Sequence, residues 1–228
     1  MNGGRGRIIA IGGRGVLALE IERRFLVLGS DWRGHSLWQA RLRQGYLSRP
    51  GDGLTVRVRT SEPRQGGAAE QAWLTLKAPS PSQRRPPGLE DGPLALPGAA
   101  TAAAVGQSPL PDPAQADRGL ALSRLEFEYR IPPTDAQALL ALTDQQLVKC
   151  RHGLDLPGGD WVLDVFEGLN APLVVAEVEL GHPAQPVDLP AWCVRDVTGR
   201  RDLSNAALAS RPLAHWSDAE RSELLPGL

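Results

Sequence analysis

The chain has 228 residues, a formal net charge of −1 and 22% charged residues. This length can supply one full-sized hydrophobic core, or one domain with a large insertion. The balanced charge gives no basic field for nucleic acid or an anionic membrane, and two cysteines are too few for a disulfide scaffold or a cysteine metal site. No apolar run reaches the roughly 18 residues that span a bilayer. We therefore expect a cytoplasmic protein without a membrane or nucleic-acid partner.

The amino-terminal part of the chain ends in a strand with an unusual charge pattern. Residues 1–17 lack a sustained apolar region and a clear signal-peptidase site, so we predict a flexible amino terminus. In the next segment, LALEIERRFLV at 17–27, charged and apolar residues alternate as in a half-buried strand. Glu20, Glu22 and Arg24 then share one face. Neighbouring carboxylates on one face repel, which indicates that a cation belongs near them.

Seven further segments show strand signals, and turn-forming residues separate several of them. They are residues 38–48, 54–61, 72–79, 123–132, 147–154, 161–168 and 173–180. Most connections are too short for a βαβ crossover, so the strands should pair antiparallel. Eight such strands can close into a barrel that holds side chains or a small ligand. The predicted fold is mainly β (α+β), an eight-stranded antiparallel β-barrel tunnel with a few flanking helices.

A long insertion interrupts the predicted strands. Residues 78–122 hold nine of the 20 prolines. Such a composition cannot bury enough apolar surface to offset its ordering entropy, so we predict a disordered insertion. The tunnel domain would span 18–216 around it, and a carboxy-terminal helix or tail would follow at 217–228.

Three helices are predicted from their capping residues. The first spans 134–143, with Thr134 as its cap, and the second spans 204–210. The third spans 217–225, where Ser217 and Glu220 have the spacing of a capping box.

Pairs of like charge recur at alternate positions of the predicted strands. The acidic pairs are Glu20 and Glu22, Glu126 and Glu128, and Glu177 and Glu179; the basic pairs are Arg41 and Arg43, Arg57 and Arg59, and Lys149 and Arg151; Lys77 and Asp164 add single charges. A solvated sheet face usually mixes the two signs, because like charges on one face destabilise it. The repulsion within these pairs of like charge is relieved if a cation binds among the carboxylates and an anion binds among the bases. The residues between several of these charges are apolar, so we expect the charged face to line the barrel interior. Cys150, between Lys149 and Arg151, should face away from it.

These side chains suit a particular chemistry. Clustered carboxylate oxygens favour a hard divalent ion, Mg²⁺ or Mn²⁺, over zinc. A ring of arginines and lysines suits a compact anion of several phosphates. A divalent ion beside a cationic clamp is typical of phosphoryl transfer or phosphate hydrolysis.

The motifs also resemble a known family. EIERRFLV is similar to the E-x-E-x-K opening strand of the CYTH family, the triphosphate tunnel metalloenzymes. RQGYLS, TVRVR, AWLTLK, RLEFEYRIP, VKCRHGL, WVLDVFEGLNAPLVVAEVEL and DVTGRRDLSNAALA resemble its successive blocks in order, from about residue 18 to 210. The resemblance implies a tunnel that binds a triphosphate together with a divalent metal.

The resemblance implies roles for individual residues. Metal ligands would be Glu20, Glu22, Glu177 and Glu179, helped by Asp164; Glu126 and Glu128 would be ligands or partners of the bases. The phosphate oxygens would be bound by seven basic side chains, those of Arg24, Arg43, Arg57, Arg59, Lys77, Lys149 and Arg151. Arg24, Lys77 and Glu179 would also take part in catalysis. Tyr46 would lie near a tunnel mouth. Arg24 replaces the family's lysine, which removes any base role, because arginine stays protonated.

Three functions remain open at this point. The first is metal-dependent hydrolysis of a short triphosphate, inorganic tripolyphosphate above all, by a monomer or homodimer. The second is a class IV adenylate cyclase or a thiamine or nucleoside triphosphatase; a cyclase needs an adenine pocket that no motif marks. The third is a non-catalytic polyphosphate-binding module, against which the retained carboxylates argue.

Overall fold

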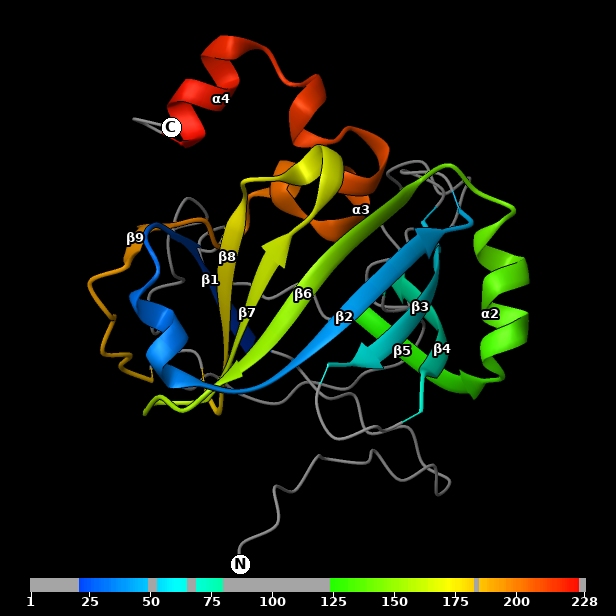
Figure 1. The fold of residues 1–228 in the computed structure, drawn as a ribbon, viewed down its shortest axis with the longest axis horizontal. Coiled ribbons are helices and arrows are strands. Elements are labelled where there is room, and N and C mark those ends of the chain that lie inside the picture. Colours follow the sequence, from blue (N-terminus) through cyan, green and yellow to red (C-terminus); the bar gives the residue numbers. More distant parts are fainter. Residues whose placement is uncertain (1–20, 49–52, 65–68, 80–123, 183–184, 226–228) are drawn as a thin grey trace, which may run out of the picture.

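A computed structural model describes residues 21–48, 53–64, 69–79, 124–182 and 185–225 (Figure 1). These residues form one antiparallel sheet with short helices around it. The strands are β1 (Ile21–Val27), β2 (Ser36–Tyr46), β3 (Thr55–Pro63), β4 (Gln71–Pro79), β5 (Arg124–Ile131), β6 (Gln146–Leu154), β7 (Asp160–Phe166), β8 (Val174–Leu180) and β9 (Cys193–Asp196). The α-helices are α2 (Pro133–Leu140), α3 (Asn205–Ser210) and α4 (Asp218–Leu224), and the 3-10 helices are η1 (Asp31–His35), η3 (Gly168–Asn170), η4 (Arg201–Leu203) and η5 (Leu213–His215). No helix among the described residues has both the length and the apolar composition of a membrane span.

The strands follow the order β5-β4-β3-β2-β6-β7-β8-β1-β9 across the sheet. All eight predicted strands are confirmed in type, but the prediction of an eight-stranded closed barrel is wrong for the described residues. A ninth strand, β9, pairs with the edge of β1 that β8 leaves open, so β1 has no edge left for β5. The sequence pattern missed β9 because its four residues are too few for alternation to show.

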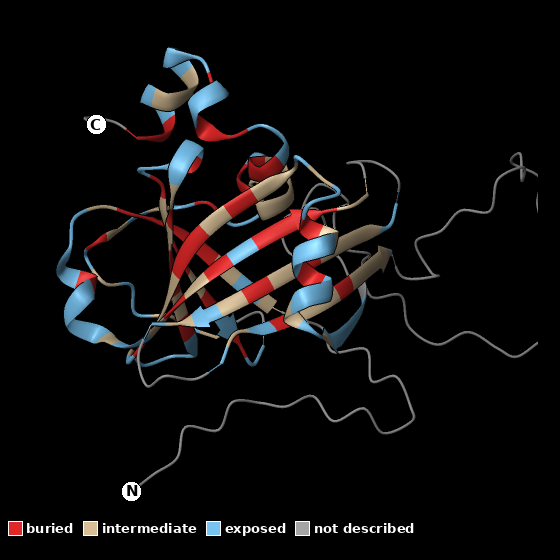
Figure 2. Ribbon diagram, turned by 45° about the vertical axis from the view of Figure 1, so that its right-hand side comes forward, coloured by how far each residue is buried: buried red, intermediate tan, exposed pale blue. Residues whose placement is uncertain are grey.

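The two faces of the sheet differ in chemistry, and buried and exposed residues alternate along several strands (Figure 2). On one face, Phe25, Leu163, Ala176 and Val178 are fully buried in a core that Trp32 and Trp161 complete. Full burial of each large apolar side chain contributes about 1.5–3 kcal/mol, so this core holds β1, β7 and β8 in register.

Helix α2 covers the same face at the other end of the sheet. Its Ala136 and Leu140 pack with Val58 of β3 and Ala72 of β4. The helix begins one residue before the predicted position. Pro132 is the residue before it, no side chain caps it, and Pro133 occupies the first turn, so the prediction of Thr134 as the cap is wrong. Proline at a first helical position loses nothing, since its missing N–H would have no partner there.

The carboxy-terminal helices cover the end of β6, β7 and β8, as Figure 1 shows for α3. Leu203, Leu208, Leu213 and Leu224 are at most 1% exposed and pack there with residues of the sheet. Both predicted caps are confirmed.

The first cap is Ser204, whose side chain accepts a hydrogen bond from the backbone N of Ala207. The second is Ser217, which forms a capping box with Glu220. Each cap satisfies backbone donors that the helix itself leaves unpaired.

Several predictions concern residues outside the described ranges. They include the amino terminus at 1–17, Glu20, and residues 80–122 of the predicted insertion. Ala78 and Pro79, assigned to that insertion, belong to β4. Pro79 and Arg124, which flank the undescribed segment, are cross-strand partners of β4 and β5.

This pairing generates a prediction for the insertion. Because its two ends emerge opposite each other, replacing residues 82–118 by a short Gly/Ser linker should leave the β4–β5 register intact. Loop-closure entropy changes by only about 0.6 kcal/mol per doubling of length. We expect a melting temperature within a few degrees of wild type, measured by calorimetry. A variant that fails to fold would show that the segment contributes to the packed structure.

Candidate active site

Most predicted site residues lie on one face of the sheet. Directly opposite residues of antiparallel strands share a face, so the register shows which side chains lie together. We call this surface the charged face; it carries Glu22, Arg24, Arg57, Arg59, Lys77, Glu126, Glu128, Arg130, Lys149, Arg151, Asp160, Asp164, Glu177 and Glu179.

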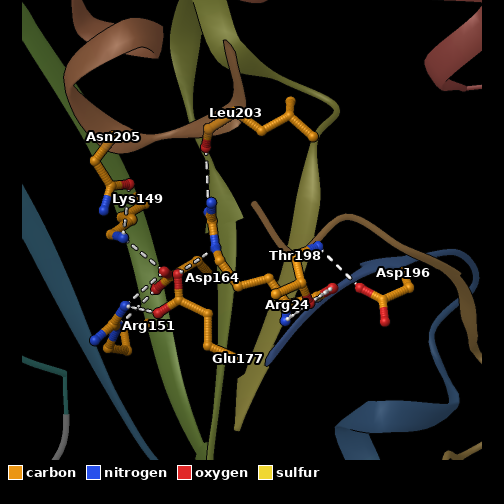
Figure 3. Close-up of polar contacts among 9 residues, drawn as sticks. All are labelled: Arg24, Lys149, Arg151, Asp164, Glu177, Asp196, Thr198, Leu203 and Asn205. Atoms are coloured by element: carbon orange, nitrogen blue, oxygen red, sulfur yellow. Dashed lines mark hydrogen bonds and ion pairs between the residues drawn. The ribbon is translucent and has the colours of Figure 1, made fainter. Parts of the chain in front are cut away.

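Five of these side chains form a continuous ion-pair chain (Figure 3). Lys149 Nζ lies 2.5 Å from Asp164 Oδ2. Arg151 binds both oxygens of Asp164, each at 2.7 Å, and also reaches Glu177 Oε2 at 2.8 Å. Arg24 Nε donates to Glu177 Oε1 at 3.1 Å. Acid and base thus alternate from Lys149 to Arg24.

Burial makes this ion-pair chain electrostatically strong. The side chains of Lys149 and Asp164 are 0% and 1% exposed. Burial alone would raise the pKa of Asp164, but the charges and hydrogen bonds of Arg151 and Lys149 outweigh it and hold the pKa well below its usual range. Burial lowers the pKa of Lys149 to about 8, although Asp164 opposes the shift. Burial would also lower the pKa of Arg151, yet Asp164 and Glu177 raise it, so this guanidinium stays charged.

A second group of bases lies on β3 and β4. Arg59 donates to Glu128 Oε1 at 3.0 Å, and Lys77 Nζ lies 2.8 Å from Glu126 Oε2. Arg57 donates to Thr75 Oγ1 at 3.1 Å. Glu126 and Glu128 therefore act as partners of the bases in this structure.

Arg57 and Arg59 are incompletely satisfied. The Nε atom of each is buried and has no hydrogen-bond partner among the described residues. Burial, then the charge of Arg57, lowers the pKa of Arg59 to about 10, and Arg151 adds to the repulsion. A buried donor without an acceptor is costly, so an anion placed between these arginines would be favourable.

Three carboxylates form a row at one end of the charged face. Glu22 lies directly opposite Glu179, and Glu179 lies directly opposite Asp160. Asp160 was not predicted as a site residue, although it shares the face of Asp164 four residues earlier on β7. No group of three or more His, Cys, Asp or Glu side chains within the described ranges already forms a metal-binding cluster. The donor chemistry nonetheless fits a hard divalent cation, because adjacent like charges are relieved by one.

The structure separates one predicted base from the others. Arg43 lies opposite Thr60 and Val148, on the face that faces away from Arg57 and Lys149. It donates to Gln146 and lines a polar hollow of about 230 Å³ beside α2. The expectation that Arg43 joins the phosphate-binding bases is therefore corrected. The error arises because the charged residues of β2 lie on the face that points away from the site, while its side chains on the charged face are mainly apolar, among them Ala40 and Leu42.

Arg24 and Cys150 occupy the expected side of the sheet, and the place of Tyr46 near a tunnel mouth stays a prediction. Arg24 shares the charged face with Glu22, and Cys150 is buried on the opposite face. Tyr46 is buried in the carboxy-terminal core, where burial raises its pKa to about 12.

The open antiparallel sheet and its buried charges define the class of protein. It is an antiparallel-sheet protein with one densely charged face, on which two buried arginine Nε atoms have no acceptor among the described residues. No protein-family model matches the chain.

Comparison with known proteins identifies the family. The inorganic triphosphatase of Nitrosomonas europaea is 31% identical over 194 residues, which cover 83% of this chain and 96% of that protein. The inorganic triphosphatase of Acetivibrio thermocellus is 34% identical over 99 residues, which cover 42% of this chain and 64% of that protein. The crystal structure of the inorganic triphosphatase NE1496 matches with a TM-score of 0.51 and 27% identity over 83% of this chain and 93% of that chain. The chain belongs to the inorganic triphosphatase family, and its resemblance to the CYTH family is confirmed.

The low pKa of Asp164 predicts how stability depends on pH. The native pKa lies below the ordinary value of 3.8, so the unfolded chain takes up this proton first as the pH falls. The stabilisation is fully present above about pH 4 and is lost towards the native pKa. Asp164→Asn should lower the melting temperature at pH 7 and flatten its decline below about pH 4.

Asp188→Asn is the matched control, because Asp188 is exposed. It should leave the acid decline unchanged. An Asp164→Asn variant with the acid decline of wild type would contradict the assignment.

Proposed function

We propose that the protein is a divalent-metal-dependent triphosphatase that hydrolyses a short triphosphate, most simply inorganic tripolyphosphate. The observation that carries this proposal is the pair of buried, unpartnered guanidinium Nε atoms of Arg57 and Arg59. The inorganic triphosphatases among its relatives support the reaction class. The proposed localisation is the cytoplasm, and the proposed assembly is a monomer or homodimer.

The bases of the charged face would bind the phosphate oxygens. Arg57, Arg59 and Lys77 would hold one part of the triphosphate, and Arg151 and Arg24 the other. In this structure these bases neutralise carboxylates. A triphosphate offers them new anionic partners, and their former carboxylate partners then become available to a cation. The charge pattern is thus suited to binding anion and cation together.

Carboxylates near the row at the end of the face would hold the cation. Glu22, Glu177 and Glu179, with Asp164, are the proposed ligands, and Asp160 is a neighbour of Glu179. Oxygen ligands favour Mg²⁺ or Mn²⁺. When bound, such an ion neutralises phosphate charge and activates water. Glu179, which is exposed, would orient the attacking water, while Arg24 and Lys77 would stabilise the charge that develops on the two parts of the triphosphate that they bind.

A substrate panel tests the proposal. Phosphate release should be measured from tripolyphosphate, ATP and thiamine triphosphate, each with Mg²⁺, Mn²⁺ or EDTA. We expect fastest release from tripolyphosphate and none in EDTA. Faster release from thiamine triphosphate, or cyclic nucleotide formed from ATP, would replace the proposed substrate. Binding of tripolyphosphate without turnover would indicate a binding module instead.

The metal assignment has its own matched pair of variants. Glu179→Gln should raise the Mg²⁺ or Mn²⁺ concentration needed for half-maximal activity about 10-fold or more, because it removes an anionic ligand with little change of shape. Glu62→Gln is the control, since Glu62 is an exposed glutamate on the opposite face. Equal metal dependence of both variants would exclude Glu179 as a ligand.

The replacement of the family's lysine by Arg24 gives a further prediction. If the role of Arg24 is electrostatic, Arg24→Lys should remain active. Arg24→Ala should lose about 2–4 kcal/mol of transition-state stabilisation, seen in kcat more than in KM. Steady-state kinetics on tripolyphosphate provide the measurement.

Arg23→Ala is the matched control on the same strand. Arg23 projects to the other face and pairs with Asp196 at 2.6 Å, with a side chain 36% exposed. Its loss should leave kcat unchanged. An Arg24→Ala variant as active as Arg23→Ala would show that Arg24 does not contact the substrate.

A further inference from the structure

Both ends of the ion-pair chain are attached to the same short stretch of backbone. At one end, Lys149 Nζ donates to the side-chain Oδ1 of Asn205 at 3.1 Å. At the other end, a terminal nitrogen of Arg24 donates to the backbone carbonyl of Leu203 at 3.1 Å (Figure 3). The two anchors are separated by a single residue, Ser204. Residues 203–205 therefore bind the first and the last of the five charged side chains in the ion-pair chain.

The anchoring stretch is itself firmly held. Leu203 is 0% exposed and packs in the carboxy-terminal core. Ser204 caps α3, and Asn205 is the first residue of that helix. A side chain on such a rigid, packed element can hold its partner in one position.

Lys149 needs this support because it is completely buried. Within the described part of the chain, its ammonium group donates to two oxygens, those of Asp164 and Asn205. The Asp164 carboxylate also binds Arg151 through both of its oxygens. If the ammonium moves, Asp164 moves with it, and the direction of the Arg151 guanidinium changes. Asn205 contacts none of the proposed phosphate-binding arginines directly.

We propose that Asn205 is a positioning residue of the triphosphatase site: its side-chain oxygen fixes the Lys149 ammonium, and thereby orients Asp164 and Arg151 towards the triphosphate. This inference rests on the proposed function. It explains why an amide with an acceptor oxygen occupies the first position of α3, where the helix itself makes no use of this side chain.

Two substitutions of Asn205 separate its hydrogen bond from its volume. Asn205→Leu keeps the size and removes the acceptor, and kcat/KM on tripolyphosphate should fall about 10- to 100-fold, as on loss of other groups that orient a ligand from behind. Asn205→Asp keeps an acceptor oxygen and should retain activity within about 3-fold of wild type. Equal activity of Asn205→Leu and wild type would overturn the proposal.

A double-mutant cycle tests whether the effect passes through Lys149. In the Lys149→Met background, Asn205→Leu should cause no further loss, because its partner is already absent. Additive losses would overturn the proposal. Ser204→Ala is the structural control: it removes the cap of the same helix but keeps the Asn205 acceptor, so it should lower the melting temperature while kcat/KM falls much less than in Asn205→Leu. If Ser204→Ala loses as much activity as Asn205→Leu, the effect belongs to helix stability and the proposal fails.

Binding distinguishes this inference from the proposed function. If wild type hydrolyses no triphosphate, the proposed function fails, and the same cycle is measured by calorimetry with tripolyphosphate. Asn205→Leu should then weaken binding about 10-fold in the wild-type background and not in the Lys149→Met background. Equal weakening in both backgrounds, or none in either, would overturn the role of Asn205.

Discussion

The buried carboxylate of Asp164 is the constraint on which the charged face depends. An isolated ionised carboxylate is very costly to bury, so it requires partners of opposite charge within hydrogen-bond distance. Lys149 and Arg151 meet this requirement from the adjacent strand. Arg151 in turn neutralises Glu177, which neutralises Arg24. The positions of four other charged side chains thus follow from the burial of one.

The bases of this network are held in fixed positions before any ligand binds. Each base is already desolvated and oriented, so under the proposed function little reorganisation would be needed for phosphate oxygens to replace the carboxylates. The arginine pair of β3 differs, because its Nε atoms lack acceptors among the described residues. The two halves of the face therefore differ in their charge balance: in one half the bases are neutralised by neighbouring acids, and in the other two buried arginine nitrogens have no acceptor among the described residues.

Much of this arrangement could be predicted from the sequence, and the exceptions have physical causes. Alternation located eight strands and the shared face of Glu22, Arg57 and Lys149, because charged and mostly apolar residues alternate along these strands. It failed for Arg43, since β2 carries its arginines on the face that points away from the site, and for β9, which is too short to show a period. It could not identify Asn205, because that role depends on a contact across 56 positions of sequence. Whether the sheet closes could not be predicted from the local sequence pattern either, because closure depends on which strand pairs with the second edge of β1.

The position of β1 between β8 and β9 has a consequence for how the protein is made. The hydrogen bond from Arg24 to Leu203 links residues 179 positions apart. Among the described strands β1 is the earliest in the chain, and it cannot pair on either side until β8 has been synthesised. Such distant contacts slow folding and leave the buried residues of β1, among them Phe25 and Leu26, exposed meanwhile. During synthesis, the interval between the emergence of β1 and that of β8 should consequently be the period in which this chain is most prone to aggregate.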